Sequence, residues 1–354
     1  MISRILGAAL AVIASLGALP ATAQTEPLPL RLGYNVSAPI GTFIAAIGTD
    51  AFAREGIKLD LQRFQDTAGL RDALVARHVD MGGVGITTMQ QAIAAGAPLK
   101  AISAFEYMFT DKAGRPWEAV FLITRKDRNI RSLADLKGKR LAVDSYVSWY
   151  LMLRDRLREA NVDVKDITFL TMPYPQMGGA MVLDQVDAAI ITSTEYVRVS
   201  QRLPVEALMT GSQLSNLKVD LTQAMFARDE WLKQNEEVTV RFLRALLRTR
   251  LYMQNDIEKN DGANMKRFIR EQLKFDDFLT DTFYRFRGGY AGRELDFINM
   301  LEIPRAVVET NARTLVGSGL LQGRTPPTFE QTVEYRYLMR AYRELALTWD
   351  DKKG

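Results

Sequence analysis

The side chains that could do chemistry in this chain are hydroxyls, amides and carboxylates that follow predicted strands, and they occur in both halves of the sequence. Such groups suit the reversible recognition of a polar molecule, and nearby aromatic rings can form flat apolar walls. The candidate ligand-binding residues are Asn35, Ser37, Asp66, Thr67, Gly85, Thr87 and Thr88, followed by Asp144, Ser145, Tyr146, Ser148, Tyr174, Ser193, Thr194 and Glu195. The aromatic candidates are Tyr107, Tyr146, Trp149 and Tyr174. Because Ser, Thr and Asp also cap helices in proteins of any function, the recurrence in both halves carries more weight than any single residue.

Residues suited to catalysis or metal binding are scarce. The chain has no cysteine, which excludes a thiol nucleophile, thiolate metal sites and disulfides. His78 is the only histidine, and its position just before a predicted strand indicates the surface end of a helix. Gly83-Val84-Gly85 lacks the third glycine of a dinucleotide-binding fingerprint. We therefore predict a binding protein and no enzyme, with no catalytic residue, no metal site and no cofactor.

Two pairs of segments recur in matching order, which indicates a duplicated unit. Val79-Asp80 and Val186-Asp187 each precede a short apolar stretch and are 107 residues apart, and the segments 32–35 and 141–144 are 109 residues apart. Two similar lobes are the simplest explanation, and the strand ends of two such lobes would face each other across a cleft. Asp80 and Asp187 precede strands and should lie away from that cleft, so they are interpreted as turn residues.

The elements that must position these residues alternate between strand and helix. The expected strands are 30–35, 59–61 and 81–84 in the first series, and 140–143, 167–170 and 188–191 in the second. Helical spacing between them predicts an α/β fold with right-handed crossovers and largely parallel sheets. A long helix is expected after Asn235, with Val238, Phe242, Leu246 and Thr249 on one face, and the rest of the chain should be mostly helical.

The N-terminal residues have the pattern of a secretory signal. Arg4 precedes the apolar run 5–19, and Ala21-Thr22-Ala23 is a small-x-small cleavage site before Gln24. A retained membrane anchor is the alternative, but the run is shorter than the roughly 20 residues that span a bilayer. We therefore expect a signal peptide at 1–23 and a periplasmic protein that, without a cysteine, carries no lipid anchor.

Charge alone does not identify a partner. The formal net charge is only +4 over 354 residues. Arg241, Arg244, Arg248 and Arg250 form a basic stripe on the predicted long helix, which could suggest nucleic acid. No aromatic platform or Gly-rich recognition loop accompanies the stripe, so a solvated helix face is the favoured interpretation and no nucleic-acid partner is predicted.

Several segments together resemble a known family. They are Leu32-Gly33-Tyr34, Gly56-Ile57, the stretch from Leu74 to Asp80, Gly96-Ala97-Pro98-Leu99-Lys100, the stretch from Ser132 to Lys139, and Val186-Asp187-Ala188-Ala189. They are similar to the NMT1/THI5-like periplasmic solute-binding proteins of ABC importers for nitrate, sulfonates, taurine and thiamine precursors. The similarity covers roughly residues 30–230, and the segment ending at Lys139 with the two Val-Asp junctions is its most specific part.

The resemblance implies a periplasmic binding protein of type II, with two doubly wound α/β lobes, a cleft between them and a helical C-terminal part. The expected divisions are lobe 1 at 24–121, lobe 2 at 122–224, and a return to lobe 1 with C-terminal helices at 225–354. It further implies a monomer that binds a small polar nitrogen- or sulfur-containing solute, closes by a hinge and delivers the solute to an ABC permease in the inner membrane.

The candidate loops depart from what a nitrate or sulfonate binder would need. Asp144 and Glu195 are acids, and the only basic residue near these loops is Arg71, one turn inside a predicted helix. An anion would meet like charge if both acids face it, which favours a neutral or cationic nitrogen-containing solute.

Two alternatives remain. One is an enzyme like the thiamine-pyrimidine synthase of the same fold family, but that enzyme uses histidine with a pyridoxal cofactor and a cysteine-rich iron motif, whereas this chain has one histidine and no cysteine. The other is the ligand-sensing subunit of a membrane signalling system, which sequence cannot separate from a transport receptor.

Overall fold

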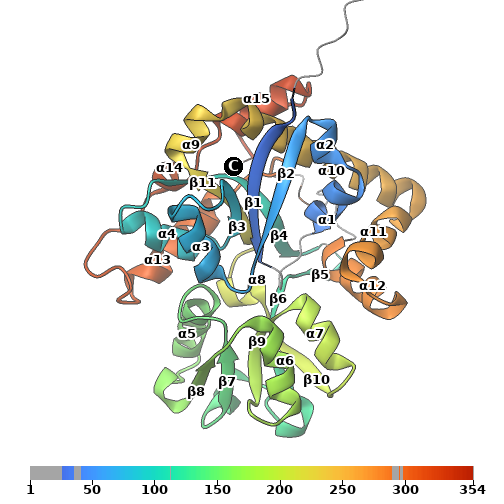
Figure 1. The fold of residues 1–354 in the computed structure, drawn as a ribbon. Helices are drawn as coiled ribbons and strands as arrows, with labels where there is room; N and C mark the ends of the chain where they lie inside the picture. The colour runs from blue at the N-terminus through green and yellow to red at the C-terminus, as the bar shows by residue number, and fades with distance from the viewer. Residues whose placement is uncertain (1–25, 36–40, 112, 289–294, 296–297, 354) are drawn as a thin grey trace, which may run out of the picture.

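The computed structural model describes residues 26–35, 41–111, 113–288, 295 and 298–353. The expected signal peptide and Ser37 lie outside these residues. The described chain forms two α/β lobes, each built on its own sheet. In Figure 1 the first sheet occupies the upper half of the view and the second sheet the lower half. No helix of the described residues is long and apolar enough to cross a membrane.

The first lobe is built on a six-stranded sheet of order β2-β1-β3-β11-β4-β5. Its strands are β1 (Leu28–Asn35), β2 (Ile57–Phe64), β3 (Met81–Val84), β4 (Leu99–Thr110), β5 (Pro116–Trp117) and β11 (Val219–Arg228). β1 pairs in parallel with β2 and β3, while β11 runs antiparallel between β3 and β4. The predicted parallel β-α-β series is therefore confirmed, and antiparallel strands extend it into a mixed sheet.

The second lobe is built on a five-stranded sheet of order β10-β6-β9-β7-β8. Its strands are β6 (Val120–Arg125), β7 (Arg140–Val143), β8 (Thr168–Thr171), β9 (Ala188–Thr192) and β10 (Val205–Thr210). β7 is parallel to β8 and β9, and β6 is antiparallel to β9 and β10. The three parallel strands repeat the arrangement of β2, β1 and β3, so each lobe contains the same three-strand unit that the repeated segments predicted.

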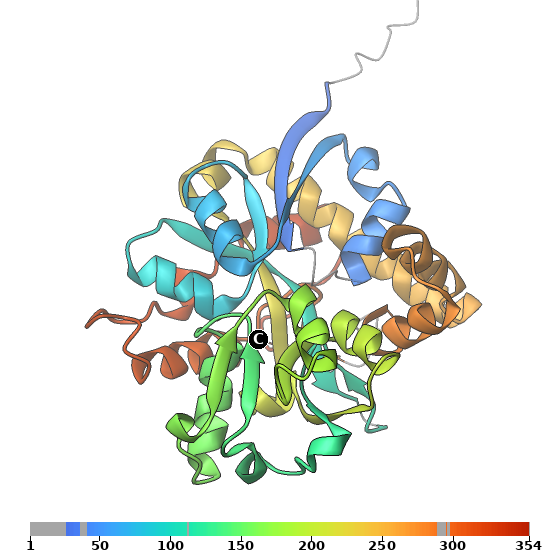
Figure 2. The same ribbon diagram turned by 60° about the horizontal axis from the view of Figure 1, so that its bottom comes forward.

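Helices connect the strands and form most of the C-terminal third, which Figure 2 shows in orange and red around the two lobes. Those of the two β-α series are α1 (Gly41–Gly48), α2 (Ala51–Arg54), α3 (Thr67–Val75), α4 (Ile86–Ala94), α5 (Trp149–Glu159), α6 (Tyr174–Val182), α7 (Ser193–Ser200) and α8 (Gly211–Ser215). The later ones are α9 (Asp229–Gln234), α10 (Glu236–Asn260), α11 (Ala263–Leu273), α12 (Asp277–Phe283), the π-helix η4 (Tyr284–Gly288), α13 (Arg305–Val316), α14 (Phe329–Thr332) and α15 (Arg336–Glu344). Short 3-10 turns are η1 (Lys126–Arg128), η2 (Leu133–Leu136) and η3 (Val164–Asp166).

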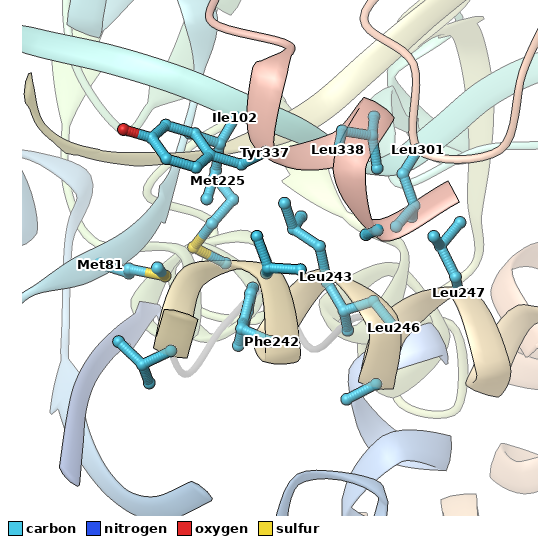
Figure 3. Close-up of a cluster of buried hydrophobic side chains, with 14 of the residues drawn as sticks. Met81, Ile102, Met225, Phe242, Leu243, Leu246, Leu247, Leu301, Tyr337 and Leu338 are labelled. Atoms are coloured by element: carbon cyan, nitrogen blue, oxygen red, sulfur yellow. The ribbon is translucent and has the colours of Figure 1, made fainter. Parts of the chain in front are cut away.

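The long helix α10 supplies much of the core of the first lobe. Figure 3 shows its side chains Phe242, Leu243 and Leu246 packed beneath Tyr337 and Leu338 of α15, and all five are buried. Residues three and four apart in a helix lie on one face, which explains why this run forms a continuous apolar stripe. The predicted buried face of the helix is therefore confirmed.

The prediction that the arginines of α10 form a solvated helix face is only partly correct. Arg244 pairs with Glu55 at 2.5 Å and Arg241 pairs with Glu237 at 2.7 Å, so both lie among acids of the same chain. Arg250 is buried, and its guanidinium lies 5.7 Å from the ring centre of Tyr107. Two residues along a helix are about half a turn, which takes the side chain from the exposed Arg248 side to the buried Arg250 side.

An ion pair between a partly exposed arginine and a buried aspartate holds the start of the parallel unit in each lobe, and we call it the Arg–Asp clasp. In lobe 1 the carboxylate of Asp80 accepts hydrogen bonds from the Arg31 backbone N–H at 3.0 Å and from its side chain at 3.1 and 2.5 Å. In lobe 2 Asp187 accepts the same three bonds from Arg140, at 2.9, 3.1 and 2.9 Å. Both aspartates stand before a strand, away from the cleft, as predicted, but they anchor neighbouring strands rather than only shaping turns.

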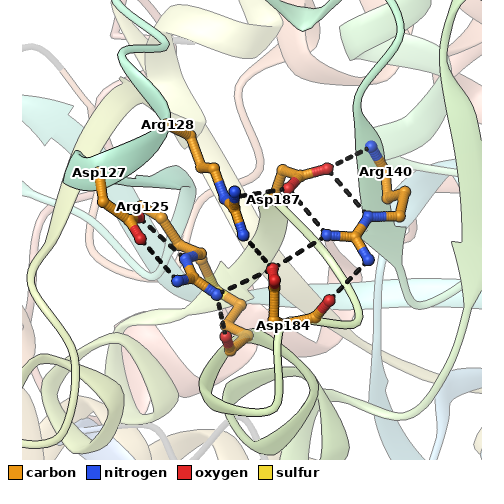
Figure 4. Close-up of polar contacts among 7 residues, drawn as sticks. Arg125, Asp127, Arg128, Arg140, Asp184 and Asp187 are labelled. Atoms are coloured by element: carbon orange, nitrogen blue, oxygen red, sulfur yellow. Dashed lines mark hydrogen bonds and ion pairs between the residues drawn. The ribbon is translucent and has the colours of Figure 1, made fainter.

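The clasp of lobe 2 belongs to a larger ion-pair network. Figure 4 shows Arg125 and Arg128 joining Arg140 around Asp184 and Asp187. Bidentate arginine–carboxylate bonds have strict geometry and therefore fix the relative positions of the segments that carry them. This edge of the lobe, opposite the cleft, is held by charge-assisted bonds.

The chain passes between the lobes at two places. It leaves the first sheet after Trp117 and enters the second at Val120, and it returns after Ser215 to re-enter the first sheet at Val219. Both crossings come several residues before the expected divisions at 122 and 225.

Candidate functional site

A cleft between the lobes is lined by residues of both sheets. The first lobe and the C-terminal part contribute Asn35, Thr67, Gly85, Ile86, Thr87, Leu221, Gln223 and Asn311. The second lobe contributes Val120, Asp144, Ser148, Trp149, Met152, Tyr174 and Thr192. The cavity volume is about 40 Å³, whereas a single water needs roughly 10–15 Å³ measured in this way. The structure therefore describes an arrangement in which the lobes nearly meet.

Strand ends explain why these residues converge. Asn35 is the last residue of β1, Gly85 follows β3 as the N-cap of α4, and Asp144 follows β7. Thr192 ends β9 and caps α7 with its side chain. In an open α/β sheet the carboxyl ends of parallel strands and the amino ends of the following helices meet at one edge, which gathers exposed N–H donors there.

Asp144 is the only acidic residue among those that line the cleft in the described structure. Part of the residue remains accessible, but its Oδ1 is shielded from solvent and accepts no hydrogen bond from any described residue. The Tyr174 hydroxyl donates a hydrogen bond to this carboxyl. Burial raises the pKa of Asp144 to about 6 despite that bond, and the charge of nearby Asp66 adds to the increase.

The buried environment of Asp144 also affects the pKa of Tyr174. Burial, together with the adjacent carboxylate and its hydrogen bond, raises the pKa of the Tyr174 hydroxyl well above its ordinary value. The phenol therefore stays protonated and acts as a donor toward Asp144. This bond helps to hold the carboxyl in place within the second lobe.

Direct contacts join the two rims. The hydroxyls of Thr88 in α4 and Ser148 before α5 are 3.3 Å apart and form a hydrogen bond between the lobes. On the first-lobe side, Thr87 donates to the side chain of Asn311 in α13. These bonds show that α4, α5 and α13 meet at the cleft, so the C-terminal helices form part of its wall.

Seven of the sequence-predicted residues line the cleft in the described structure. They are Asn35, Thr67, Gly85, Thr87, Asp144, Ser148 and Tyr174, and the aromatic candidate Trp149 lines it as well. Thr88 lies beside them through its bond to Ser148. Asp66 instead caps α3 by accepting a 2.7 Å bond from the Gly69 N–H, which is the helix-cap alternative considered for such residues.

The remaining predicted residues do not line the cleft. The Tyr146 side chain is 47% exposed and packs edge-on against Tyr150, and neither Ser145 nor Tyr146 is among the lining residues. Ser193 and Thr194 are buried in the first turn of α7. Glu195 pairs with Arg198 at 2.7 Å within the same helix. The expectation that Glu195 faces a solute alongside Asp144 is therefore corrected.

Several lining residues were missed by the sequence interpretation. Gln223 lies in β11 where the pairing with β4 shifts register, and Asn311 comes from a C-terminal helix. Neither follows a strand of the repeated series, so the strand-end rule could not find them. Ile86, Val120, Met152 and Leu221 give the cleft apolar walls beside Trp149, and nothing local distinguishes them from core residues.

Comparison with known proteins identifies the family. The model of the family described as NMT1/THI5 like matches residues 39–259. The chain belongs to this family. A Brucella abortus (strain 2308) protein named as a binding protein is 26% identical over 238 residues, which is 66% of this chain and 70% of that protein.

Solved structures share the fold at low sequence identity. The alkanesulfonate-binding protein SsuA from Xanthomonas axonopodis pv. citri, bound to MOPS, has a TM-score of 0.67 and 20% identity over 85% of this chain and 96% of its own. The ligand-binding component of an ABC-type import system from Staphylococcus aureus has a TM-score of 0.69 and 16% identity over 89% and 99%. The desulfurization enzyme DszB also has this fold, with a TM-score of 0.64 and 11% identity over 90% and 99%. The α/β fold is thus shared by binding proteins and by an enzyme, so the site must decide between them.

Proposed function

We propose that this protein is the periplasmic solute-binding receptor of an ABC importer. The observation that carries the proposal is the cleft, into which hydroxyl, amide and carboxyl groups of both lobes point from strand ends. Membership of a family that includes binding proteins supports the proposal, as does the similarity to an ABC-type import component. The signal-like N-terminus supports export to the periplasm.

The described cleft is built for recognition rather than chemistry. Its hydroxyls lie next to amides and aliphatic side chains, and no histidine or lysine is among the described lining residues to act as their base. The enzyme DszB therefore shares the fold with this chain without indicating its activity. We propose that the protein has no chemical step.

The size of the cavity supports hinge closure. A volume of about 40 Å³ is far below the 300–1,000 Å³ typical of sites for organic ligands. A solute of ordinary size must therefore enter while the lobes are apart, and rotation at the two interlobe crossings would separate them without disturbing either sheet. The bond between Thr88 and Ser148 would break on opening.

The proposal is tested on protein purified from the periplasmic fraction. Mass spectrometry should find the N-terminus at Gln24, and a thermal-shift screen of a small-metabolite library should find at least one solute that binds. Ser148→Ala in the cleft should weaken that binding about fivefold to tenfold, consistent with loss of one hydrogen bond. The control Ser200→Ala, at an exposed position of α7, should bind like wild type. A folded protein that binds no library member would overturn the receptor function.

A further inference from the structure

Among the described residues that line the cleft, one group sets its charge. Asp144 is the only charged residue among the described residues that line the cavity, and no arginine, lysine or histidine is among them. Asp66, at the cap of α3, is close enough to act on Asp144 and adds further negative charge. A solute carrying a sulfonate or nitrate group would therefore meet negative charge with no cation among the described lining residues to balance it.

The carboxyl of Asp144 also has unused capacity as an acceptor. Its Oδ1 is shielded from solvent and accepts no hydrogen bond within the described structure. A buried acceptor without a donor costs free energy, and native structures leave few such groups without a functional reason. Tyr174 and the Ser145 N–H already donate to the carboxyl, which leaves Oδ1 as its open acceptor position.

The rest of the wall defines the body of a matching solute. Trp149, Met152 and Leu221 provide apolar surface, while Thr67, Asn35 and Gln223 provide hydroxyl and amide groups. An apolar body with one end that donates hydrogen bonds complements this distribution. A purely anionic solute would leave Oδ1 unsatisfied and would add repulsion.

From these observations we infer that the solute is a small organic cation whose protonated nitrogen donates a hydrogen bond to Asp144. The inference rests on the proposed receptor function and narrows its substrate class. It sets this chain apart from SsuA, the alkanesulfonate-binding protein that shares its fold. An ion pair to a carboxylate is among the stronger hydrogen bonds available in a protein, because both donor and acceptor are charged.

The test uses cation and anion probes matched in size. Titration calorimetry at pH 7.5 compares methylguanidinium, acetamidinium and benzylammonium with methanesulfonate, nitrate and benzoate. We expect binding by at least one cation and by no anion. Asp144→Asn keeps the shape of the side chain and its acceptor for Tyr174 but removes the charge, so it should weaken cation binding tenfold or more. Glu206→Gln, at an exposed position of β10, should leave it unchanged.

A second measurement needs no variant of the cleft. Asp144 faces two other titratable groups, Tyr174 from α6 and Asp66 from the cap of α3. The affinity of the permanently charged methylguanidinium should fall about tenfold per pH unit below pH 6, because burial holds the pKa of Asp144 near 6 and its protonation removes the charge. Circular dichroism at each pH confirms that the protein stays folded.

The outcomes separate this inference from the receptor function. Binding of an anion with no cation, equal cation affinity in Asp144→Asn and wild type, or affinity that does not change with pH would each overturn the cationic solute while leaving the receptor in place. If the cation probes and the metabolite library are both without effect on folded protein, the receptor function itself fails.

Discussion

Glu118 offers a direct test of the energetics at the interlobe crossing. It lies between β5 and β6, its side chain is 1% exposed, and its carboxylate accepts a 3.2 Å hydrogen bond from the Ser212 N–H and another from the Ser212 hydroxyl. Burial is the main reason that the pKa of Glu118 is raised to about 8, and the nearby charge of Asp220 adds to it. The folded protein therefore keeps this acid protonated at neutral pH.

The sign of the pH dependence follows from that pKa. Between the ordinary value of 4.5 and about 8, the folded state holds a proton that the unfolded chain releases, so the stability due to this group is complete below pH 4.5 and is lost as pH rises through 8. Each pH unit in this window changes the free energy of unfolding by ~1.4 kcal/mol. At pH 7 the loss amounts to roughly 3 kcal/mol.

Glu118→Gln should remove this loss. A glutamine amide is always neutral, its Nε2 can donate to the Ser212 hydroxyl, and its oxygen can accept from the Ser212 N–H. The variant should match wild type in urea unfolding near pH 4.5 and exceed it by roughly 3 kcal/mol at pH 7, followed by far-UV circular dichroism. The exposed control Glu206→Gln should show no growing difference. A difference independent of pH, or a less stable variant at pH 7, would refute the reasoning.

Three further substitutions test other parts of the fold. Asp187→Asn should lower the free energy of unfolding by about 2 to 3 kcal/mol at pH 7 and by less in acid. Burial raises the pKa of Asp187, but the hydrogen bonds and charges of the arginines outweigh it and lower the pKa below its ordinary value, so the stability that the charged Asp187 contributes is lost as pH falls through this lowered pKa. An equal loss at pH 3 and pH 7 would contradict this. Gly33→Val should cost about 1 to 3 kcal/mol in urea unfolding, since a Cβ at Gly33 would lie 2.2 Å from Leu70 Cδ1, and a stable variant would contradict it. Thr88→Val should increase the ligand-free radius of gyration in solution scattering by removing the interlobe bond to Ser148, and an unchanged radius would show that this bond does not hold the lobes together.

Much of the architecture could be predicted because it follows periodic rules. The strands expected at 81–84 and 140–143 coincide with β3 and β7, and the recurring offsets correspond to a repeated three-strand unit. Strand alternation and helix caps are local features that can be read from neighbouring residues. The mixed character of both sheets could not be read in this way, because strands such as β11 enter a sheet from distant parts of the chain.

The residues of the cleft likewise include some that the sequence could predict and some that it could not. Asn35, Thr87 and Asp144 follow strands of the repeated unit, and a rule about strand ends was enough to bring them together. Asn311 reaches the cleft only because α13 packs against α4 and α5, a contact between segments more than 140 residues apart. Glu195 follows a strand as Asp144 does, yet it turns along its own helix to Arg198. The rule gives the place of a residue, whereas side-chain direction depends on partners that it does not consider.

The amino ends and the carboxyl ends of the parallel strands have different roles in this protein. At the amino ends, Arg31–Asp80 and Arg140–Asp187 repeat the same three hydrogen bonds, so the parallel unit of each lobe is fixed in the same way. At the carboxyl ends the two lobes differ, with Asn35 in one and Asp144 in the equivalent place of the other. Because the clasps hold strand register far from the cleft, a residue at the carboxyl end can change without disturbing the sheet. A lone carboxylate such as Asp144 can thus set the charge of the site while the clasps maintain the fold.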